Sequence, residues 1–242
     1  MPTSTYTYTT PGAASAGGVR DAFKVSAWVV FASMTGFGSL ARDSGLTLGV
    51  SMVSSGAIWG LPGQIAFAEL YATGAPVLAI VLAVSLANVR FLPMIVSMMP
   101  LFREGVKNRA WHYVFAHLAS VNTWAAAMRV CPHLAHELRA PYYVGFSIVC
   151  LLSGLAGTAT GFVLAVALPA VVTLSLVFLN PVYFTIVFAD VRHRSGVIAL
   201  LIGAVVGPLF YQLSPDWGLL ATGAIGGALA YLIDRFLRRR DE

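Results

Sequence analysis

Residues 54–100 read SSGAIWGLPGQIAFAELYATGAPVLAIVLAVSLANVRFLPMIVSMMP, and this stretch decides the fold class. It is apolar enough for two membrane crossings of about 20 residues each. Within those crossings, however, Gln64, Glu69, Asn88 and Arg90 would stand at the depth of the hydrocarbon. Polar side chains there are costly and tend to face a bundle interior or a watery cavity. The stretch therefore predicts membrane helices that enclose a functional polar layer.

Helix-breaking residues stand next to the first of these polar groups. Pro62 has no backbone N–H and leaves the carbonyl of Ile58 without its helical donor, while Gly60 and Gly63 loosen the same turn. Backbone freed at membrane depth persists only where it is buried in protein or lines a cavity. We therefore expect the helix to break beside Gln64, and a discontinuous helix of this kind is a candidate substrate-binding element.

The composition of the whole chain agrees with a membrane protein. Of 242 residues, 58% are hydrophobic and only 10% are charged, whereas soluble domains have roughly 25% charged residues. The basic residues are scattered over loop ends and the C-terminus, which excludes a nucleic-acid-binding face. Cys131 and Cys150 have no metal-ligand spacing. Because no nucleophile motif, phosphate loop or metal cluster is found either, we expect no enzyme activity and no cofactor.

Apolar runs predict an all-α polytopic fold of about eight transmembrane helices, separated by charged or turn-forming junctions. Residues 1–18 are polar and small and are predicted to be a disordered tail, residues 19–237 a single transmembrane domain, and residues 238–242 a charged C-terminal end. The fourth helix carries several polar side chains and either crosses fully or lies partly at the interface. The eight expected helices cover residues 23–41, 46–72, 76–100, 110–130, 142–167, 169–190, 196–213 and 217–237.

Basic residues orient these helices, and a faint repeat relates them. With the N-terminus inside, most lysines and arginines outside the helices fall on the cytoplasmic side, which places both termini in the cytoplasm of a cell (inner) membrane protein. Small residues recur in the second and fifth helices, and Asn88 and Asn180 each precede a proline, so residues 23–100 and 110–190 are candidate inverted repeats. Packing alone also explains small residues in membrane helices.

The expected binding site draws on the second, third and sixth helices. The Gln64 amide has two donors and an acceptor, and it either binds a substrate or satisfies the carbonyls that the break frees. Pro181 frees a carbonyl as Pro62 does, and the neighbouring Asn180 joins Asn88 in the predicted polar layer. The predicted substrate-binding residues are Gly60, Pro62, Gly63, Gln64, Asn88 and Asn180.

Three more residues are candidates for energy coupling or ion pairing: Glu69, Arg90 and Asn122. A buried Glu69 would suit a proton relay, but its place near the end of the second helix favours contact with water. Arg90 either binds a substrate carboxylate or, as the favoured interpretation, pairs with a buried acid such as Glu69. Asn122 is expected to bond a neighbouring helix, as lone polar residues in membrane helices usually do.

The order and spacing of several motifs carry a family resemblance. The motifs are Gly18-Val19-Arg20-Asp21-Ala22-Phe23, Gly36-Phe37-Gly38, Ser54 to Gln64, Gly74-Ala75-Pro76, Asn88-Val89-Arg90 and Gly157-Thr158. From about Val19 to Leu237 the chain resembles the AzlC-type branched-chain amino-acid permeases, the larger component of a two-subunit exporter. The resemblance implies a secondary transporter that exports branched-chain or related small apolar amino acids with a small AzlD-type membrane subunit.

The chain departs from that family pattern at two places. The family often reads Phe-Ala-Gly-Ala-Ser/Ala-Gln where this chain has Trp59 to Gln64, and it commonly has an Asp-Glu pair where Val121 and Asn122 stand here. An acid pair in a membrane is the natural candidate for a coupling proton or for the ammonium of a substrate. A channel-like pore for small solutes, a non-transporting membrane subunit of a larger complex, and a homo-oligomer in place of the small partner remain alternatives.

Overall fold

The computed structural model describes residues 8–106, 108–167, 169–189, 194–213 and 225–241. Throughout these ranges the regular structure is helical, which confirms the all-α prediction. By its internal contacts the chain divides into two compact units, residues 1–183 and 184–242, where one domain over residues 19–237 was expected.

The first helix begins earlier than expected. Helix α1, Pro11–Lys24, starts where the Thr10 hydroxyl accepts a hydrogen bond from the Ala13 N–H at 3.2 Å, with Pro11 at the favoured first position. Gly17 and Gly18 are buried. The prediction of a disordered tail is therefore wrong for residues 11–18, because the small residues that suggested a tail form a packing face.

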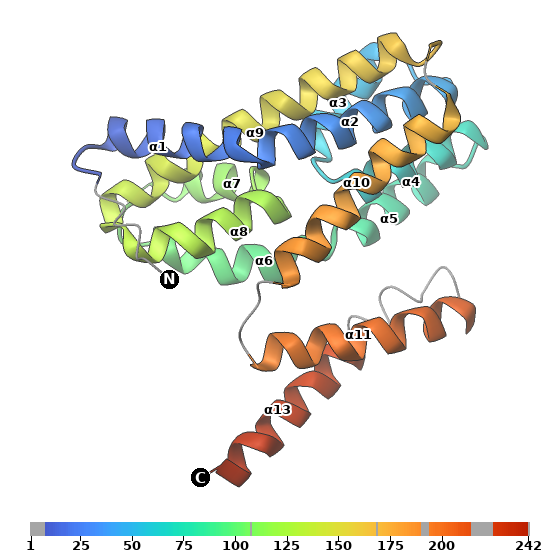
Figure 1. Cartoon of the computed structure of the whole chain (residues 1–242). Helices are drawn as coiled ribbons and strands as arrows, with labels where there is room; N and C mark the ends of the chain where they lie inside the picture. The colour runs from blue at the N-terminus through green and yellow to red at the C-terminus, as the bar shows by residue number, and fades with distance from the viewer. Residues whose placement is uncertain (1–7, 107, 168, 190–193, 214–224, 242) are drawn as a thin grey trace. The chain divides into compact units, whose positions relative to one another are not determined.

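Helices α1 and α2, Ser26–Asp43, run along α9, His136–Leu164, and these are the most extensive helix contacts in the first unit (Figure 1). Glycines allow the close approach. A Cβ added to Gly38 would run into the carbonyl oxygen of Thr158, and one added to Gly161 would run into that of Thr35. Small residues let helix backbones approach closely and pack well. The continuous helix α9 is therefore the scaffold for the site described below.

The second and third predicted helices are both interrupted. Residues 46–72 form α3, Leu48–Ala57, and α4, Leu61–Ala72, with the break at residues 58–60, beside Gln64 as expected. Residues 76–100 form α5, Val77–Asn88, and α6, Phe91–Met98, which the 3₁₀ turn η1, Met99–Phe102, continues. The chain bends by 46° between α5 and this second piece.

The fourth predicted helix is two short helices, so a continuous helix over residues 110–130 is a wrong prediction. Helix α7, Ala110–His117, ends before a capping box in which the Ser120 hydroxyl accepts from the Thr123 N–H and the Ser120 N–H donates to Thr123 Oγ1. Helix α8, Val121–Val130, follows from this cap, and the 3₁₀ turn η2, Cys131–His133, leads into α9.

The remaining helices follow the predicted order. Helix α10, Ala170–Ala189, begins directly after Pro169, where a boundary was expected. In the second unit, α11, Arg194–Leu213, packs against α13, Gly227–Asp241, so residues 238–241 belong to a helix instead of a separate end. The segment at 214–224 lies outside the described residues. The inverted repeat stays a prediction. It relates the second predicted helix to the fifth, and the second is broken within residues 46–72 whereas α9, at the place of the fifth, is continuous.

Among the described residues, α9 is the one helix long and apolar enough to cross a membrane by itself. Two bent pairs also pass the same test when each is taken as a single span, and they raise the number to three. These pairs are α1 with α2, bent by 55°, and α5 with its continuation through α6 and η1. The eight-span topology stays a prediction.

Candidate functional site

The break between α3 and α4 is held in an uncommon backbone conformation. Trp59 has a φ of +47°, and it is the one non-glycine residue with a positive φ in the described part of the chain. For a bulky residue this is an outlier that the surrounding structure must hold in place. The Trp59 side chain is only 5% exposed, and a Cβ added to Gly154 of α9 would lie 3.0 Å from its Cζ3 atom. The break is therefore buried against the scaffold helix.

Asn88, the last residue of α5, contacts the break with its side chain. Its Nδ2 donates to the carbonyl oxygen of Ile58 at 3.4 Å, which is the carbonyl that Pro62 deprives of its helical donor. A Cβ added to Gly60 would lie 2.6 Å from Asn88 Oδ1, and one added to Gly63 would lie 2.9 Å from it. Both glycines are thus needed because the asparagine side chain lies directly against them.

Gln64 is fully buried and bonds a neighbouring helix through its amide. Its Nε2 donates to Ser55 Oγ at 2.9 Å, and Ser55 Oγ shares a hydrogen bond of 2.8 Å with Thr158 Oγ1 of α9. A chain of three buried polar side chains therefore links α4, α3 and α9. The freed carbonyl of Ile58 bonds Asn88 instead, so the alternative in which Gln64 satisfies that carbonyl is wrong.

Three buried polar atoms at the break have no hydrogen-bond partner among the described residues: Trp59 Nε1, Gln64 Oε1 and Asn88 Oδ1. The first is a donor and the other two are acceptors. Buried polar groups in native proteins are nearly always hydrogen-bonded, and leaving one unpaired costs roughly 1–3 kcal/mol. The break therefore holds one donor and two acceptors whose hydrogen bonds are not made within the described residues.

A further unpartnered atom lies on α8. Asn122 Oδ1 is buried without a hydrogen-bond partner in the described residues. Asn122 stands one turn before Ala126, which belongs to the same core cluster as Trp59. This cluster extends from α1 to α9, so it shows Asn122 at the core but not in contact with the break.

The predicted ion pair between Glu69 and Arg90 is not formed. Glu69 is exposed near the end of α4, as its position favoured, and neither residue takes part in an ion pair in the described part of the chain. The Arg90 guanidinium lies over the ring of Phe91, 5.2 Å from its centroid, and Arg90 Nε has no hydrogen-bond partner in the described residues. A cation–π contact thus takes the place of the expected carboxylate.

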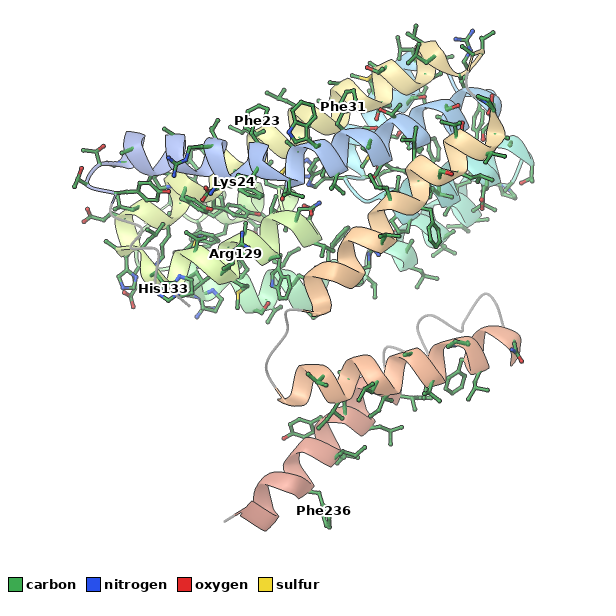
Figure 2. All side chains as sticks on the ribbon, in the orientation of Figure 1. Phe23, Lys24, Phe31, Arg129, His133 and Phe236 are labelled. Atoms are coloured by element: carbon green, nitrogen blue, oxygen red, sulfur yellow. The ribbon has the colours of Figure 1, made fainter. Side chains whose placement is uncertain are left out.

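A buried acid that the sequence pattern did not reveal is Asp21 of α1. Its Oδ2 accepts a hydrogen bond from the Tyr142 hydroxyl of α9 at 2.9 Å, and its Oδ1 pairs with Lys24 Nζ at 2.8 Å (Lys24 is labelled in Figure 2). Tyr142 precedes Gly154, the neighbour of Trp59, by twelve helical positions, or about 18 Å. Asp21 therefore lies away from the break, and its hydrogen bond with Tyr142 links α1 to α9.

Asn180 cannot be placed with the other predicted residues, because its side chain lies outside those that the structure describes. Its helix, α10, reaches the core through a hydrogen bond of 3.0 Å between Thr173 Oγ1 and Ser39 Oγ of α2. A Cβ added to Gly36 would lie 2.7 Å from Val177 Cγ2. Helix α10 thus packs closely against α2.

Both cysteines are buried and free. Burial raises the pKa of the Cys131 thiol to about 12, although the nearby Arg139 acts to lower it. A thiol with so high a pKa is inert at neutral pH, which agrees with a packing role. Among the described residues no group of three metal-ligating side chains is found.

A family model described as AzlC protein matches residues 26–168. No curated protein and no solved structure matches the chain. The matched region is more than half of the chain, and it contains the break, Asn88 and the hydrogen-bonded chain from Gln64 to Thr158. Family membership suggests a function related to membrane transport, and the apolar helix α9 is consistent with a membrane protein. By this match the chain belongs to the AzlC family.

Proposed function

We propose that this protein is the large subunit of a secondary transporter that exports branched-chain or related small apolar amino acids, and that the substrate binds at the break between α3 and α4. The observation that carries the proposal is the set of three buried polar atoms without partners, Trp59 Nε1, Gln64 Oε1 and Asn88 Oδ1. An amino-acid zwitterion supplies N–H donors from its ammonium and acceptors from its carboxylate. A zwitterion therefore matches the one donor, Trp59 Nε1, and the two acceptors, Gln64 Oε1 and Asn88 Oδ1, at the break.

The groups around the break suit an aliphatic substrate side chain. Ile58 and Trp59 form the break itself, and a Cβ added to Gly60 would lie 2.9 Å from Cε2 of Phe91. Apolar side chains therefore surround the polar atoms. Because the polar atoms are neutral, they hold a zwitterion weakly, and weak binding allows release on the other side of the membrane.

The groups at the break favour binding over chemistry. The hydroxyls of Ser55 and Thr158 bond each other and Gln64, and no histidine or acid is among their hydrogen-bond partners in the described residues. An activated nucleophile needs such a base beside it. In a non-transporting scaffold, the buried polar groups would all hydrogen-bond one another. The three unpartnered atoms argue against that alternative.

We further propose that the protein lies in the cell (inner) membrane with both termini in the cytoplasm and with a small AzlD-type membrane subunit as its partner. The outer face of α5 supports a contact with lipid or with that subunit. None of its residues is buried within this chain, and Val77, Leu78, Val81 and Leu82 are each more than half exposed. Large apolar surfaces of this kind are covered in a functional assembly.

The test is uptake of radiolabelled leucine, valine and alanine by proteoliposomes that contain the full chain with its partner subunit. Gln64→Leu removes the buried amide and is expected to abolish transport while the purified protein stays monodisperse. Gln212→Leu, the same exchange at an exposed position of α11, is the matched control and is expected to leave transport unchanged. A normal transport rate per Gln64→Leu molecule contradicts the proposed site, and an uptake rate that does not saturate with solute concentration indicates a channel.

A further inference from the structure

We propose that Trp59 is the residue that recognises the carboxylate of the substrate, by donating its indole N–H to a carboxylate oxygen. This inference rests on the proposed function and assigns a role within the same site. An indole nitrogen is a donor only, whereas the unpartnered atoms of Gln64 and Asn88 are oxygens and accept. The two acceptors therefore match the ammonium group of a zwitterion, and Trp59 matches its carboxylate.

The position of the indole is fixed by its packing. Cζ3 and Cη2 face α9, where a Cβ added to Gly154 would lie 3.0 Å and 3.5 Å from these two atoms. Nε1 lies on the opposite edge of the ring system, so the N–H faces away from this contact. The positive φ of Trp59 is also a costly conformation, and such conformations cluster at ligand sites. The strained conformation and the buried donor without a partner thus occur in the same residue.

The neighbouring backbone favours an anion at the same place. Trp59 directly precedes Gly60, the N-cap residue of the 12-residue helix α4, and no side chain caps that helix. The first N–H groups of a helix have no intrahelical partners, and the positive end of the helix dipole attracts negative charge. Pro62 has no N–H, so the backbone donors at this end are those of Leu61 and Gly63. Together with the indole N–H they offer a carboxylate its hydrogen bonds without a cation.

Arg90 is the competing candidate for the carboxylate. Its guanidinium lies over Phe91, and Phe91 in turn lies against Gly60. The Arg90 side chain is therefore near the break, and its Nε has no hydrogen-bond partner among the described residues. A variant at this position has to accompany the Trp59 variant, because both residues are able to donate to a carboxylate.

Two probes separate carboxylate recognition from general binding: leucine, and 3-methylbutylamine, which is leucine without its carboxylate. Transport KM and kcat for both are measured with the full chain and its partner subunit in proteoliposomes. Trp59→Phe keeps an aromatic ring and removes the N–H. We expect it to raise the KM for leucine by roughly 10- to 100-fold, the range of a hydrogen bond to a charged group, and to leave the KM for the amine within about twofold.

Gly154→Ala is the second variant, and it keeps the inference testable if Trp59→Phe does not fold. The added methyl group displaces the indole ring without removing its N–H, so it is expected to raise the KM for leucine more than that for the amine. Arg90→Gln is expected to change the KM for both probes by the same factor. Equal effects of Trp59→Phe on the two probes, or a loss specific to leucine in Arg90→Gln alone, overturn the assignment.

The wild type and Gln64→Leu distinguish this inference from the proposed function. If the wild type transports leucine and Gln64→Leu transports neither probe, the site stands, and the Trp59 variants then decide the role of the indole. If the wild type transports neither leucine nor any other amino acid, the proposed function fails and the assignment of Trp59 fails with it.

Discussion

The hydroxyl groups of Ser55 and Thr158 lie 2.8 Å apart and join the broken segment to the continuous helix α9. Gln64 donates to the same serine, so both halves of the break, α3 and α4, are connected to one residue of the scaffold. Buried networks in which the hydrogen bonds are made hold one arrangement of side chains. The Gln64 amide, whose Oε1 has no partner among the described residues, is therefore held in a defined position.

Thr158→Val should weaken this arrangement. Valine has nearly the shape of threonine but lacks the hydroxyl, so Ser55 loses one partner at a cost of roughly 1–2 kcal/mol. For a chain of this length, 1 kcal/mol shifts Tm by roughly 2–4 °C. We expect a lower Tm and a slower transport rate, with Thr158→Ser close to wild type. Thr160→Val, on the same helix but only half buried, is the control. An unchanged Tm and rate in Thr158→Val would show that the network holds nothing in place.

Gly161→Ala tests the close packing of α2 on α9. Its Cβ would run into the carbonyl oxygen of Thr35, which is backbone and cannot rotate away. The helices must separate, so Tm should fall by several degrees, since overpacking typically costs about 1–3 kcal/mol. Gly56→Ala in α3 is the matched control, because its Cβ meets nothing within 4 Å and alanine is the better helix former. A similar Tm for the two variants in detergent would contradict this packing.

The parts of the fold that follow from local chemistry were predictable. Pro62 lacks an N–H wherever the chain lies, so the break beside Gln64 and the freed carbonyl of Ile58 were visible in the sequence. The break between α7 and α8 has only a weak local signal, since Ser120 and Thr123 have capping-box spacing but a threonine stands where the box usually has Glu or Gln.

The parts that depend on tertiary contacts were not predictable. Residues 11–18 resemble a tail in composition, yet Gly18 and its neighbours form a face whose partner lies on α9, more than 120 positions away. The left-handed conformation of Trp59 depends on the packing of its ring at Gly154, and no local pattern marks it. The prediction of an ion pair between Glu69 and Arg90 was wrong for the same reason. The sequence does not show which faces α4 and α6 turn toward each other.

Tyr142→Phe should destabilise the contact between α1 and α9. It removes the hydroxyl that donates to Asp21 Oδ2 and leaves one oxygen of a buried carboxylate without that donor. We expect a loss of roughly 1–3 kcal/mol, seen as a lower Tm, with little change in the KM for leucine because the residue is remote from the break. Tyr113→Phe, at a tyrosine that is 79% exposed, is the control and should have no effect. A large rise in KM for Tyr142→Phe would place Asp21 in the transport mechanism.

The cysteines allow the predicted orientation to be tested without a cysteine-free background. With the Cys131 pKa near 12, its thiolate fraction at pH 8 is on the order of one in ten thousand, and Cys150 is buried as well. Native protein should therefore resist maleimide, while unfolding in detergent should expose both thiols. Cysteines introduced at positions 194 and 239 are expected to react from the cytoplasmic side, and one at position 216 from the outside. Labelling of position 216 from the cytoplasm alone would reverse the proposed orientation.

Glu69→Gln tests whether an acid of the broken segment couples transport to a proton. Glu69 is exposed near the end of α4 and forms no ion pair with described residues, whereas Gln64 is fully buried in the hydrogen-bonded chain. Neutralising an exposed carboxylate removes no buried contact, so transport should fall by less than about twofold and keep its pH dependence. Gln64→Leu, measured in the same proteoliposomes across pH 5 to 8, should abolish it. If Glu69→Gln eliminates transport and its pH dependence together, Glu69 carries the coupling proton and the peripheral role inferred from its exposure is wrong.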